Sequence, residues 1–245
     1  MNQVSSDIVK QFAPTGTLRV SINLGNTVLA QRDAATGAPK GITVDLANEL
    51  GRRLGVPLSL VPFDAAGKVF EAIKRGEIDV AFLAIEPVRA AEIDFTAPYV
   101  LIEGTYLVPR DSPLKAIADV DRAGVRIAVA TGSAYDLYLS RTIKNATLVR
   151  EPSGPEALER FMRERLEAAG GVRQPLVEFA ARHPEFRVME GRFMAIQQAM
   201  GTPKGRPAAA AYLRGFVEEL KASGFVADAL RRSNQPDAVV APPGG

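Results

Sequence analysis

Few residues in this chain of 245 could perform covalent chemistry. There is no cysteine, which excludes disulfides, thiolate metal sites and cysteine nucleophiles. His183 is the only histidine, so the chain cannot build a histidine-rich metal site or a triad that needs more than one imidazole. We therefore expect no catalytic residue, no metal and no cofactor, and any function would rest on recognition by charge and hydrogen bonding.

Two short segments carry groups suited to binding an anion. The guanidinium of Arg89 offers a planar set of donors and keeps its charge when buried, although its spacing alone is typical of an ion pair with Glu86 or Glu92. Thr131-Gly132-Ser133 is a tight turn between a predicted strand and a predicted helix. Many helices begin with small polar residues, so the turn by itself identifies no site.

The first half of the chain alternates between strand and helix patterns. Apolar periodicity predicts strands over 18–24, 58–62 and 78–83, with helices over 43–54 and 64–75 between them. Such a β-α-β-α-β run predicts a parallel sheet with right-handed crossovers. Ligands of parallel sheets bind outside the carboxyl ends of the strands, so the segments after Leu24, Val61 and Leu83 form the candidate site in this half.

A second α/β pattern follows, with a strand over 125–130, a tight turn over 131–134, and then a helix with Tyr135 and Leu139 facing inward. Extended connectors near 105–109 and 192–198 predict two crossings between two α/β units with a hinge between them. The expected division is an N-terminal arm over 1–14, a first lobe over 15–105 and 197–232, a second lobe over 106–196, and a flexible tail over 233–245.

Composition excludes several classes of partner. Net charge is +2, from 30 basic and 28 acidic residues, which gives no electrostatic reason to expect nucleic acid or an anionic membrane surface. No apolar run approaches the ~20 residues of a membrane span. Residues 1–14 lack the charged start and continuous apolar stretch of a secretory signal. The expected location is periplasmic if a signal has been removed, and cytoplasmic otherwise.

Four motifs, in this order and spacing, resemble one protein family. They are Gly16-Thr-Leu-Arg-Val20, the segment 41–55 (GITVDLANELGRRLG), the segment 70–80 (FEAIKRGEIDV) and the segment 87–99 (PVRAAEIDFTAPY). The chain is similar over about residues 15–232 to bacterial extracellular solute-binding proteins of the polar amino-acid type, the receptors of amino-acid ABC importers. The resemblance implies a type II periplasmic-binding-protein-like α/β fold with two lobes. Each lobe would be a mainly parallel sheet flanked by helices, and two crossover strands would act as hinges.

The resemblance also implies roles for particular residues. The family's arginine in the fourth motif, here Arg89, grips the ligand carboxylate. The turn Thr131-Gly132-Ser133 would hold the other side of that carboxylate through backbone N–H groups at a helix N-terminus. Phe63 stands where the family often has an aromatic that stacks on the ligand, although an aromatic at a strand end is more often part of the core.

Two departures from the family pattern concern the ligand. Ala84 and Glu86 occupy positions where the family commonly carries serine and threonine hydroxyls. Val172 stands where amino-acid binders carry the acidic residue that takes the ligand ammonium. Either Glu86 replaces that acid, or the ligand has no ammonium group.

The remaining candidates each have a structural alternative. Asn23 and Asn26 could donate hydrogen bonds from the loop after the first strand, or serve that turn. Gln197 lies at the second crossover and could reach the ligand or bond only within the hinge. Arg173 could add positive charge to the site or face solvent.

The leading hypothesis is therefore a monomeric receptor that closes around a small carboxylate ligand, an amino acid or related organic anion, and presents itself to an ABC permease. An alternative is an enzyme of the cyclohexadienyl dehydratase kind, which needs a general acid at the leaving group. Glu86 is the one candidate for that acid. A third hypothesis is a ligand sensor or carrier that is not exported.

Overall fold

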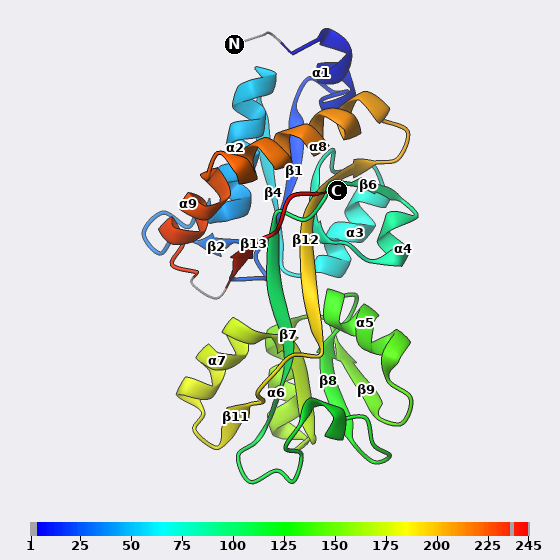
Figure 1. Ribbon diagram of the computed structural model, residues 1–245, viewed down its shortest axis with the longest axis vertical. Coiled ribbons are helices and arrows are strands. Elements are labelled where there is room, and N and C mark those ends of the chain that lie inside the picture. Colours follow the sequence, from blue (N-terminus) through cyan, green and yellow to red (C-terminus); the bar gives the residue numbers. More distant parts are fainter. Residues whose placement is uncertain (1–3, 236–237, 245) are drawn as a thin grey trace. The chain divides into compact units, whose positions relative to one another are not determined.

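The chain forms two compact units in a computed structural model that describes residues 4–235 and 238–244 (Figure 1). Unit 1 comprises Met1–Leu101 and Gln197–Gly245, and unit 2 comprises Ile102–Ile196. Strands β7 (Val100–Pro109) and β12 (Met194–Pro203) carry the chain from one unit to the other. We expected the first division after residue 105, but the compact units divide after residue 101.

Unit 1 is built on a short parallel arrangement of strands. β1 (Leu18–Asn23) pairs in parallel with β4 (Leu58–Phe63), and an isolated parallel bridge between Val20 and Val80 brings in the segment that leads to β5 (Ala81–Ala84). The connections are the helices α2 (Ile42–Leu54) and α3 (Ala66–Lys74). This is the β-α-β-α-β arrangement that the periodicity predicted.

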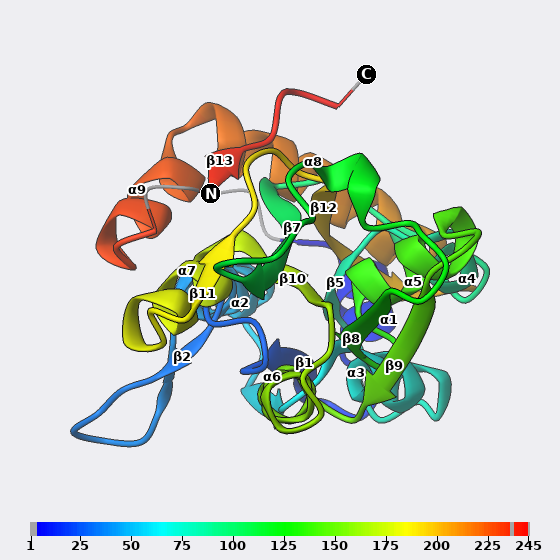
Figure 2. The same ribbon diagram turned by 90° about the horizontal axis from the view of Figure 1, so that it is seen from below.

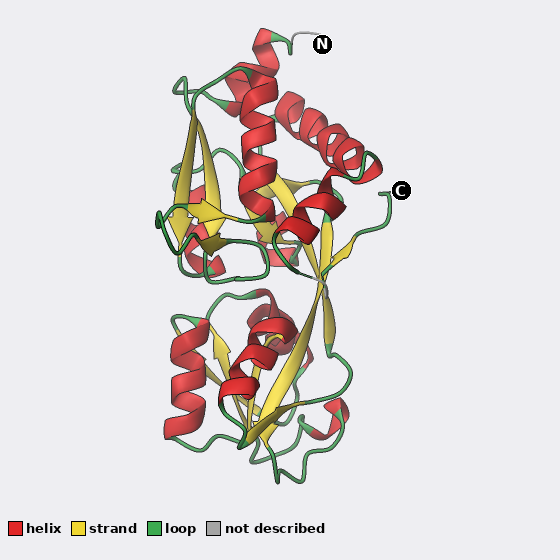
Figure 3. Cartoon of the chain, turned by 90° about the vertical axis from the view of Figure 1, so that its left-hand side faces the viewer, coloured by secondary structure: helices red, strands yellow, loops and turns green. Residues whose placement is uncertain are grey.

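Further elements complete unit 1, and helices flank its strands (Figure 3). β12 runs antiparallel to β5 and to β6 (Ile93–Phe95). The other elements are α1 (Ser6–Phe12), β2 (Gln31–Arg32), β3 (Pro39–Lys40), α4 (Pro87–Ala90), α8 (Pro207–Ala222), α9 (Phe225–Arg232) and β13 (Val239–Val240).

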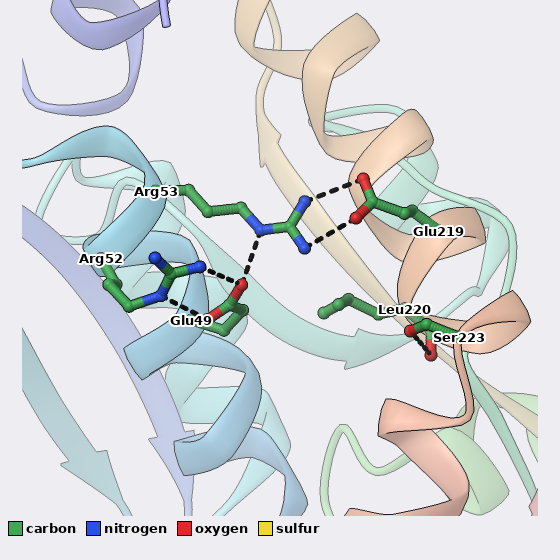
Figure 4. Close-up of polar contacts among 6 residues, drawn as sticks. All are labelled: Glu49, Arg52, Arg53, Glu219, Leu220 and Ser223. Atoms are coloured by element: carbon green, nitrogen blue, oxygen red, sulfur yellow. Dashed lines mark hydrogen bonds and ion pairs between the residues drawn. The ribbon is translucent and has the colours of Figure 1, made fainter. Parts of the chain in front are cut away.

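A network of ion pairs fastens α2 to α8 on the surface of unit 1 (Figure 4). Both terminal nitrogens of Arg53 donate to the carboxylate of Glu219 at 2.9 Å, and its Nε donates to Glu49 at 2.7 Å. Arg52 adds two hydrogen bonds of 2.8 Å to Glu49. Bidentate geometry of this kind makes a surface ion pair worth more than an isolated contact.

The N-terminal arm packs on unit 1. The ring of Phe12 is fully buried and meets Tyr212 of α8 edge-to-face at 5.9 Å. The side-chain oxygen of Gln11 accepts hydrogen bonds from the backbone N–H groups of Ala208 and Ala209, which open α8. α1 thus supplies a cap for the N-terminus of another helix.

Unit 2 is a sheet covered on both faces. β8 (Arg126–Ala130) lies parallel to both β9 (Thr147–Glu151) and β10 (Ala168–Val172), while β7 and β11 (Phe186–Val188) are antiparallel additions. The helices are α5 (Ala134–Thr142), α6 (Gly154–Arg163) and α7 (Arg173–Arg182), with a 3₁₀ turn at Ile117–Asp119. α5 lies on one side of β8 and β10, and α6 and α7 lie on the other (Figure 2).

Alternation along the strands explains this layering. Ile127 and Val129 of β8 join the core beneath α5, which includes Leu139. Ala128, between them, belongs to the other core, which includes Phe161 of α6. The period of two in a strand therefore assigns adjacent residues to opposite faces.

β10 was not predicted from the sequence. Its residues, Ala168-Ala-Gly-Gly-Val172, include only one β-branched side chain. The structure gives the reason for the small residues. A Cβ on Gly171 would lie 3.1 Å from Leu176, and one on Gly170 would lie 3.3 Å from Leu139. Helices on both faces approach this strand too closely for larger side chains.

The expected flexible tail is wrong for the part of it that the structure describes. β13 pairs antiparallel with β7, through Val239 with Leu101 and Val240 with Val100. Ala241 is buried and its N–H donates to the carbonyl of Tyr99 at 3.1 Å. Residues 236, 237 and 245 of the predicted tail lie outside the described residues.

None of the helices in the described ranges is both long and apolar enough to cross a membrane.

Candidate functional site

In unit 1, three strand ends meet at one edge. Asn23, the last residue of β1, is in register with Phe63, the last residue of β4. Ser21 of β1 receives a hydrogen bond from Phe82 of β5, which ends at Ala84. The structure therefore brings Asn23, Phe63 and Ala84 to the carboxyl ends of neighbouring parallel strands, where this kind of sheet binds ligands.

The loop after β1 lies tightly against the end of β4. A Cβ on Gly25 would lie 2.1 Å from the carbonyl oxygen of Asp64, so only glycine fits. The side-chain oxygen of Asn23 accepts the Gly25 N–H at 3.1 Å. Asn23 thus serves the turn, which was one of its two predicted roles.

Asn26 differs from Asn23. It is only 9% exposed, and among the described residues its Oδ1 has no hydrogen-bond partner. A buried polar atom without a partner costs about 1–3 kcal/mol, so it is suited to accept a donor from a ligand. Phe63, by contrast, is half-buried and packs against the core formed around α3.

The segment at α4 carries the two charged groups of this edge. Glu86 is the N-cap residue of α4 and is 3% exposed, and Arg89 is 1% exposed. Nη1 of Arg89 donates to the carbonyl of Ala84 at 2.9 Å. Burial lowers the pKa of Arg89 to about 10, while the nearby charge of Glu86 acts to raise it. Arg89 is therefore a buried cation close to the carboxylate of Glu86, one of the two acids with which its spacing predicted an ion pair.

Backbone contacts connect β12, the second crossover strand, to the same edge of unit 1. The carbonyl of Gln197 accepts the Ile85 N–H at 2.9 Å, and Gln198 is in register with Ala84. The side chain of Gln197 is exposed, whereas that of Gln198 is buried.

In unit 2, the turn Thr131-Gly132-Ser133 forms where it was predicted, between β8 and α5. Ser133 is the N-cap of α5, and its Oγ accepts the Asp136 N–H at 3.0 Å. Gly132 has φ of +68°, in the left-handed region that glycine adopts without strain.

The backbone N–H groups of this turn already have partners inside unit 2. Thr131 donates to the carbonyl of Glu151 at 2.8 Å, and Ser133 to that of Ala130 at 3.1 Å. Gly132 donates to Oδ2 of Asp136 at 2.8 Å. An anion at this turn would therefore compete with a carboxylate of the chain itself.

Asp136 was not among the site residues predicted from the sequence. Its Oδ1 also accepts Nε of Arg150 at 2.9 Å and the hydroxyl of Ser140 at 3.3 Å. The sequence does contain a signal for this arrangement. In Ser133-Ala-Tyr-Asp136 an N-cap serine is followed three positions later by an acidic residue, the spacing at which each side chain can accept a hydrogen bond from a backbone N–H group near the other residue.

Val172 and Arg173 lie where β10 passes into α7. Val172 is the N-cap of α7 and contributes no polar group. Nε of Arg173 donates to Glu103 at 2.6 Å, and its terminal nitrogens donate to the carbonyls of Met189 and Gly191. Arg192 shares Glu103 at 3.1 Å. Arg173 is therefore engaged in structural contacts within unit 2.

In the part of the chain that the structure describes, no three histidine, cysteine, aspartate or glutamate side chains are grouped so that they could hold a metal ion.

Comparison with known proteins defines the class. The sequence pattern of the bacterial extracellular solute-binding proteins, family 3, matches residues 20–233. The chain is 23% identical over 208 residues to the amino-acid-binding protein AabA of Dichelobacter nodosus, which covers 82% of this chain and 81% of that one.

Solved structures show the same fold. The solute receptor for L-cysteine of Neisseria gonorrhoeae superposes with a TM-score of 0.80 at 22% identity, covering 94% of each chain. The ancestral amino acid-binding protein AncCDT-1, a precursor of cyclohexadienyl dehydratase, superposes with a TM-score of 0.75 at 23% identity, covering 91% of this chain and 98% of that one.

The fold is thus the two-lobed α/β fold of type II periplasmic binding proteins, as predicted. The chain belongs to the bacterial extracellular solute-binding proteins, family 3, and its partner is a small-molecule solute.

Proposed function

We propose that this protein is the solute receptor of an ABC importer, and that it takes an amino acid or a related small organic anion. The burial of Arg89 is the observation that supports a carboxylate as the ligand. A guanidinium that is almost fully buried at the carboxyl ends of parallel strands is a costly feature, which a bound carboxylate would compensate through paired, charge-assisted hydrogen bonds. Asn26, with its buried amide oxygen, is the second proposed ligand contact in unit 1.

Unit 2 offers fewer groups for ligand binding in this proposal. The hydroxyl groups of Thr131 and Ser133 stand at the N-terminus of α5, but the N–H of Gly132 is occupied by Asp136. Val172 would offer apolar contact only. We propose no direct ligand contact for Asn23 or Arg173, because the turn and Glu103 already engage their side chains.

The direct test is ligand binding to protein that has been unfolded and refolded to remove carried-over ligand. A thermal-shift screen would cover the twenty amino acids, dicarboxylates and aromatic carboxylates, followed by calorimetry of each hit. A ligand at a hundredfold excess over its Kd should stabilise the protein by about 2.7 kcal/mol. Arg89→Ala should abolish the shift, while Arg75→Ala, which removes an exposed arginine of the same unit, should leave it unchanged.

Failure of every carboxylate to bind would contradict the proposal, as would full binding by a folded Arg89→Ala protein. Circular dichroism of each variant separates lost binding from lost folding. Arg89→Lys is a useful third variant, since lysine keeps the charge but not the paired donors, and should bind weakly.

We further propose that the protein is not an enzyme, acts as a monomer, is periplasmic and meets an ABC permease. The alternative with a specific observation behind it is dehydratase activity, because Glu86 is a buried acid at the proposed site and AncCDT-1 shares the fold. Incubation with prephenate decides between them. Turnover that Glu86→Gln abolishes would establish the enzyme, and its absence at high protein concentration supports the receptor.

A further inference from the structure

The outgoing and returning stretches of chain run side by side within unit 2. The chain enters and leaves this unit at the two ends of Ile102–Ile196. β11 pairs antiparallel with β7, and the hydrogen bonding continues towards the point where the chain leaves. The N–H of Met189 donates to the carbonyl of Tyr106 at 2.9 Å. Further along, the N–H of Phe193 donates to the carbonyl of Gly104 at 3.0 Å.

The two stretches also pack closely through their side chains. A Cβ on Gly104 would lie 2.8 Å from Cγ of Met194 and 2.9 Å from the ring of Phe193, so a larger residue there would push these side chains away. The hydroxyl of Thr105, which is fully buried, donates to the carbonyl of Gly191 at 3.0 Å. The start of β7 in unit 2 is therefore fastened to the segment that leads into β12.

Arg173 fastens a third segment to the same place. β10 pairs antiparallel with β7 as far as Val172, which brings the next residue, Arg173, beside Glu103. Its Nε donates to the carboxylate of Glu103 at 2.6 Å. Its terminal nitrogens reach past β7 and donate to the carbonyls of Met189 and Gly191. One guanidinium thus holds the end of β10, the start of β7 and the returning segment.

The local sequence does not favour an arginine at this position. Arg173 is the first residue of α7, and the N-terminus of a helix carries a partial positive charge that favours acidic side chains. Arg192 brings a second cation, which donates to the same Glu103 at 3.1 Å. Two cations therefore share one carboxylate that is itself only 36% exposed. The contacts that Arg173 makes with both crossover segments offset its unfavourable place on the helix.

The crossover strands are held on the side of unit 1 as well. β13 pairs with β7 as far as Leu101. β5 pairs with β12, and the carbonyl of Gln197 accepts the N–H that follows β5. In unit 2 the contacts of β7 begin at Glu103, and the backbone hydrogen bonds of the returning segment reach Phe193. A few residues of each strand lie between these two sets of contacts, and such short stretches are where hinge motion changes the backbone angles.

We propose that Arg173, Glu103 and Arg192 form a clamp that holds the two crossover strands together where they enter unit 2, so that bending between the units is confined to Ile102 and residues 194–196. Arg173 is the positioning residue of this clamp. The inference goes beyond the proposed function, because it does not depend on which solute binds. Clamped strands make unit 2 turn as one body on both connections, whereas separate strands would allow it many more orientations.

The test measures the distance between the two units in refolded protein without ligand. The chain has no cysteine, so spin labels can be attached at Asn48→Cys in α2 and Glu159→Cys in α6, both at exposed positions. Double electron–electron resonance then gives the distribution of distances between the labels. Arg173→Met keeps much of the aliphatic stem but removes every donor of the guanidinium. It should make the distribution about twofold broader, because the two strands then move separately.

Arg126→Met is the matched control. Arg126 makes two hydrogen bonds of 2.9 Å to Glu167 and one of 3.0 Å to the carbonyl of Arg165. It lies at the start of β8, and the clamp lies where the parallel strand β10 ends, at the opposite edge of the unit 2 sheet. This variant should leave the distribution unchanged. If Arg173→Met does not fold, Glu103→Gln should broaden the distribution instead, because it weakens the contacts of both arginines of the clamp.

Hydrogen exchange tests the clamp itself. The amide of Phe193 should be protected in the wild type and in Arg126→Met, and should exchange at least tenfold faster in Arg173→Met. An unchanged distance distribution in folded Arg173→Met would overturn the proposal. Equal broadening by Arg126→Met, or rapid exchange of the Phe193 amide in the wild type, would also overturn it. None of these results bears on the proposed ligand site, which is tested by binding.

Discussion

The backbone N–H of Gly132 donates a hydrogen bond of 2.8 Å to the buried carboxylate of Asp136. The carboxylate of Asp136 thus accepts a hydrogen bond from a backbone N–H group just before α5, which has no carbonyl acceptor within the helix. Arg150 holds the same carboxylate from β9, so one aspartate ties together the turn, the helix and the neighbouring strand.

Replacing Asp136 by alanine should lower the free energy of unfolding by about 2 kcal/mol, because a cap is lost and the partner of Arg150 is removed. Asp136→Asn should cost less, since the amide oxygen can still accept the Gly132 N–H. Urea unfolding measures both effects. Glu178→Ala, on the exposed surface of α7, should stay within about 0.5 kcal/mol of the wild type. An Asp136→Ala loss no larger than that of the control would show that the contact is not stabilising.

Apolar periodicity predicted most of the main strands and helices of both units, because a long element repeats its pattern of apolar residues several times. It could not predict α4, which has only four residues and gives no periodicity to read. The burial of Arg89 depends on the end of β5, just before α4 in the sequence, and on β12, which pairs with β5 from far away in the sequence. Arg89 was therefore identified by family resemblance, while its burial emerged only from the fold.

The prediction of a flexible C-terminal segment, made from its composition, was wrong for a related reason. Proline, glycine and small polar residues normally indicate a mobile end. Here Gly244 lies so close to unit 1 that a Cβ would come within 2.7 Å of Ala97, and α8 supplies the groups that bind the segment. Local sequence contains no record of such distant partners, and the same holds for the small residues of β10.

The ion network between α2 and α8 should make stability depend on acid pH. The hydrogen bonds from Arg52, with further help from Arg53, hold the pKa of Glu49 at about 2, well below its usual value of 4.5. A carboxylate whose pKa is lower in the folded state stabilises the fold above the unfolded pKa. That contribution disappears as the pH falls from about 4.5 towards 2.

Glu49→Gln should therefore be less stable than the wild type by about 2 kcal/mol at pH 7, and the difference should shrink towards zero near pH 2. Urea unfolding at several pH values gives the difference directly. Glu71→Gln, which removes a more exposed partner of Lys74, should change stability little at any pH. A difference for Glu49→Gln that stays constant between pH 7 and pH 3 would contradict the role assigned to its charge.

Lys221 should control the order of the C-terminal segment. Its side chain is only 5% exposed, and its Nζ donates to the carbonyls of Pro242 at 2.8 Å and Pro98 at 3.2 Å while pairing with Glu218. Lys221→Met keeps the aliphatic stem but leaves both carbonyls without their donor. We expect a loss of about 1–3 kcal/mol in the free energy of unfolding, as for other buried polar groups deprived of a partner.

Hydrogen exchange can locate that effect. The amide of Ala241, bonded to the carbonyl of Tyr99, should be protected in the wild type and should exchange at least tenfold faster in Lys221→Met. Lys40→Met, at an exposed lysine of the same unit, should leave it protected. The ladder between β13 and β7 reaches Leu101, the last residue of unit 1 before the chain crosses, so the amides of this part of β7 should lose protection as well. Rapid exchange of Ala241 in the wild type would instead mean that the segment is detached in solution, and that Lys221 does not hold it.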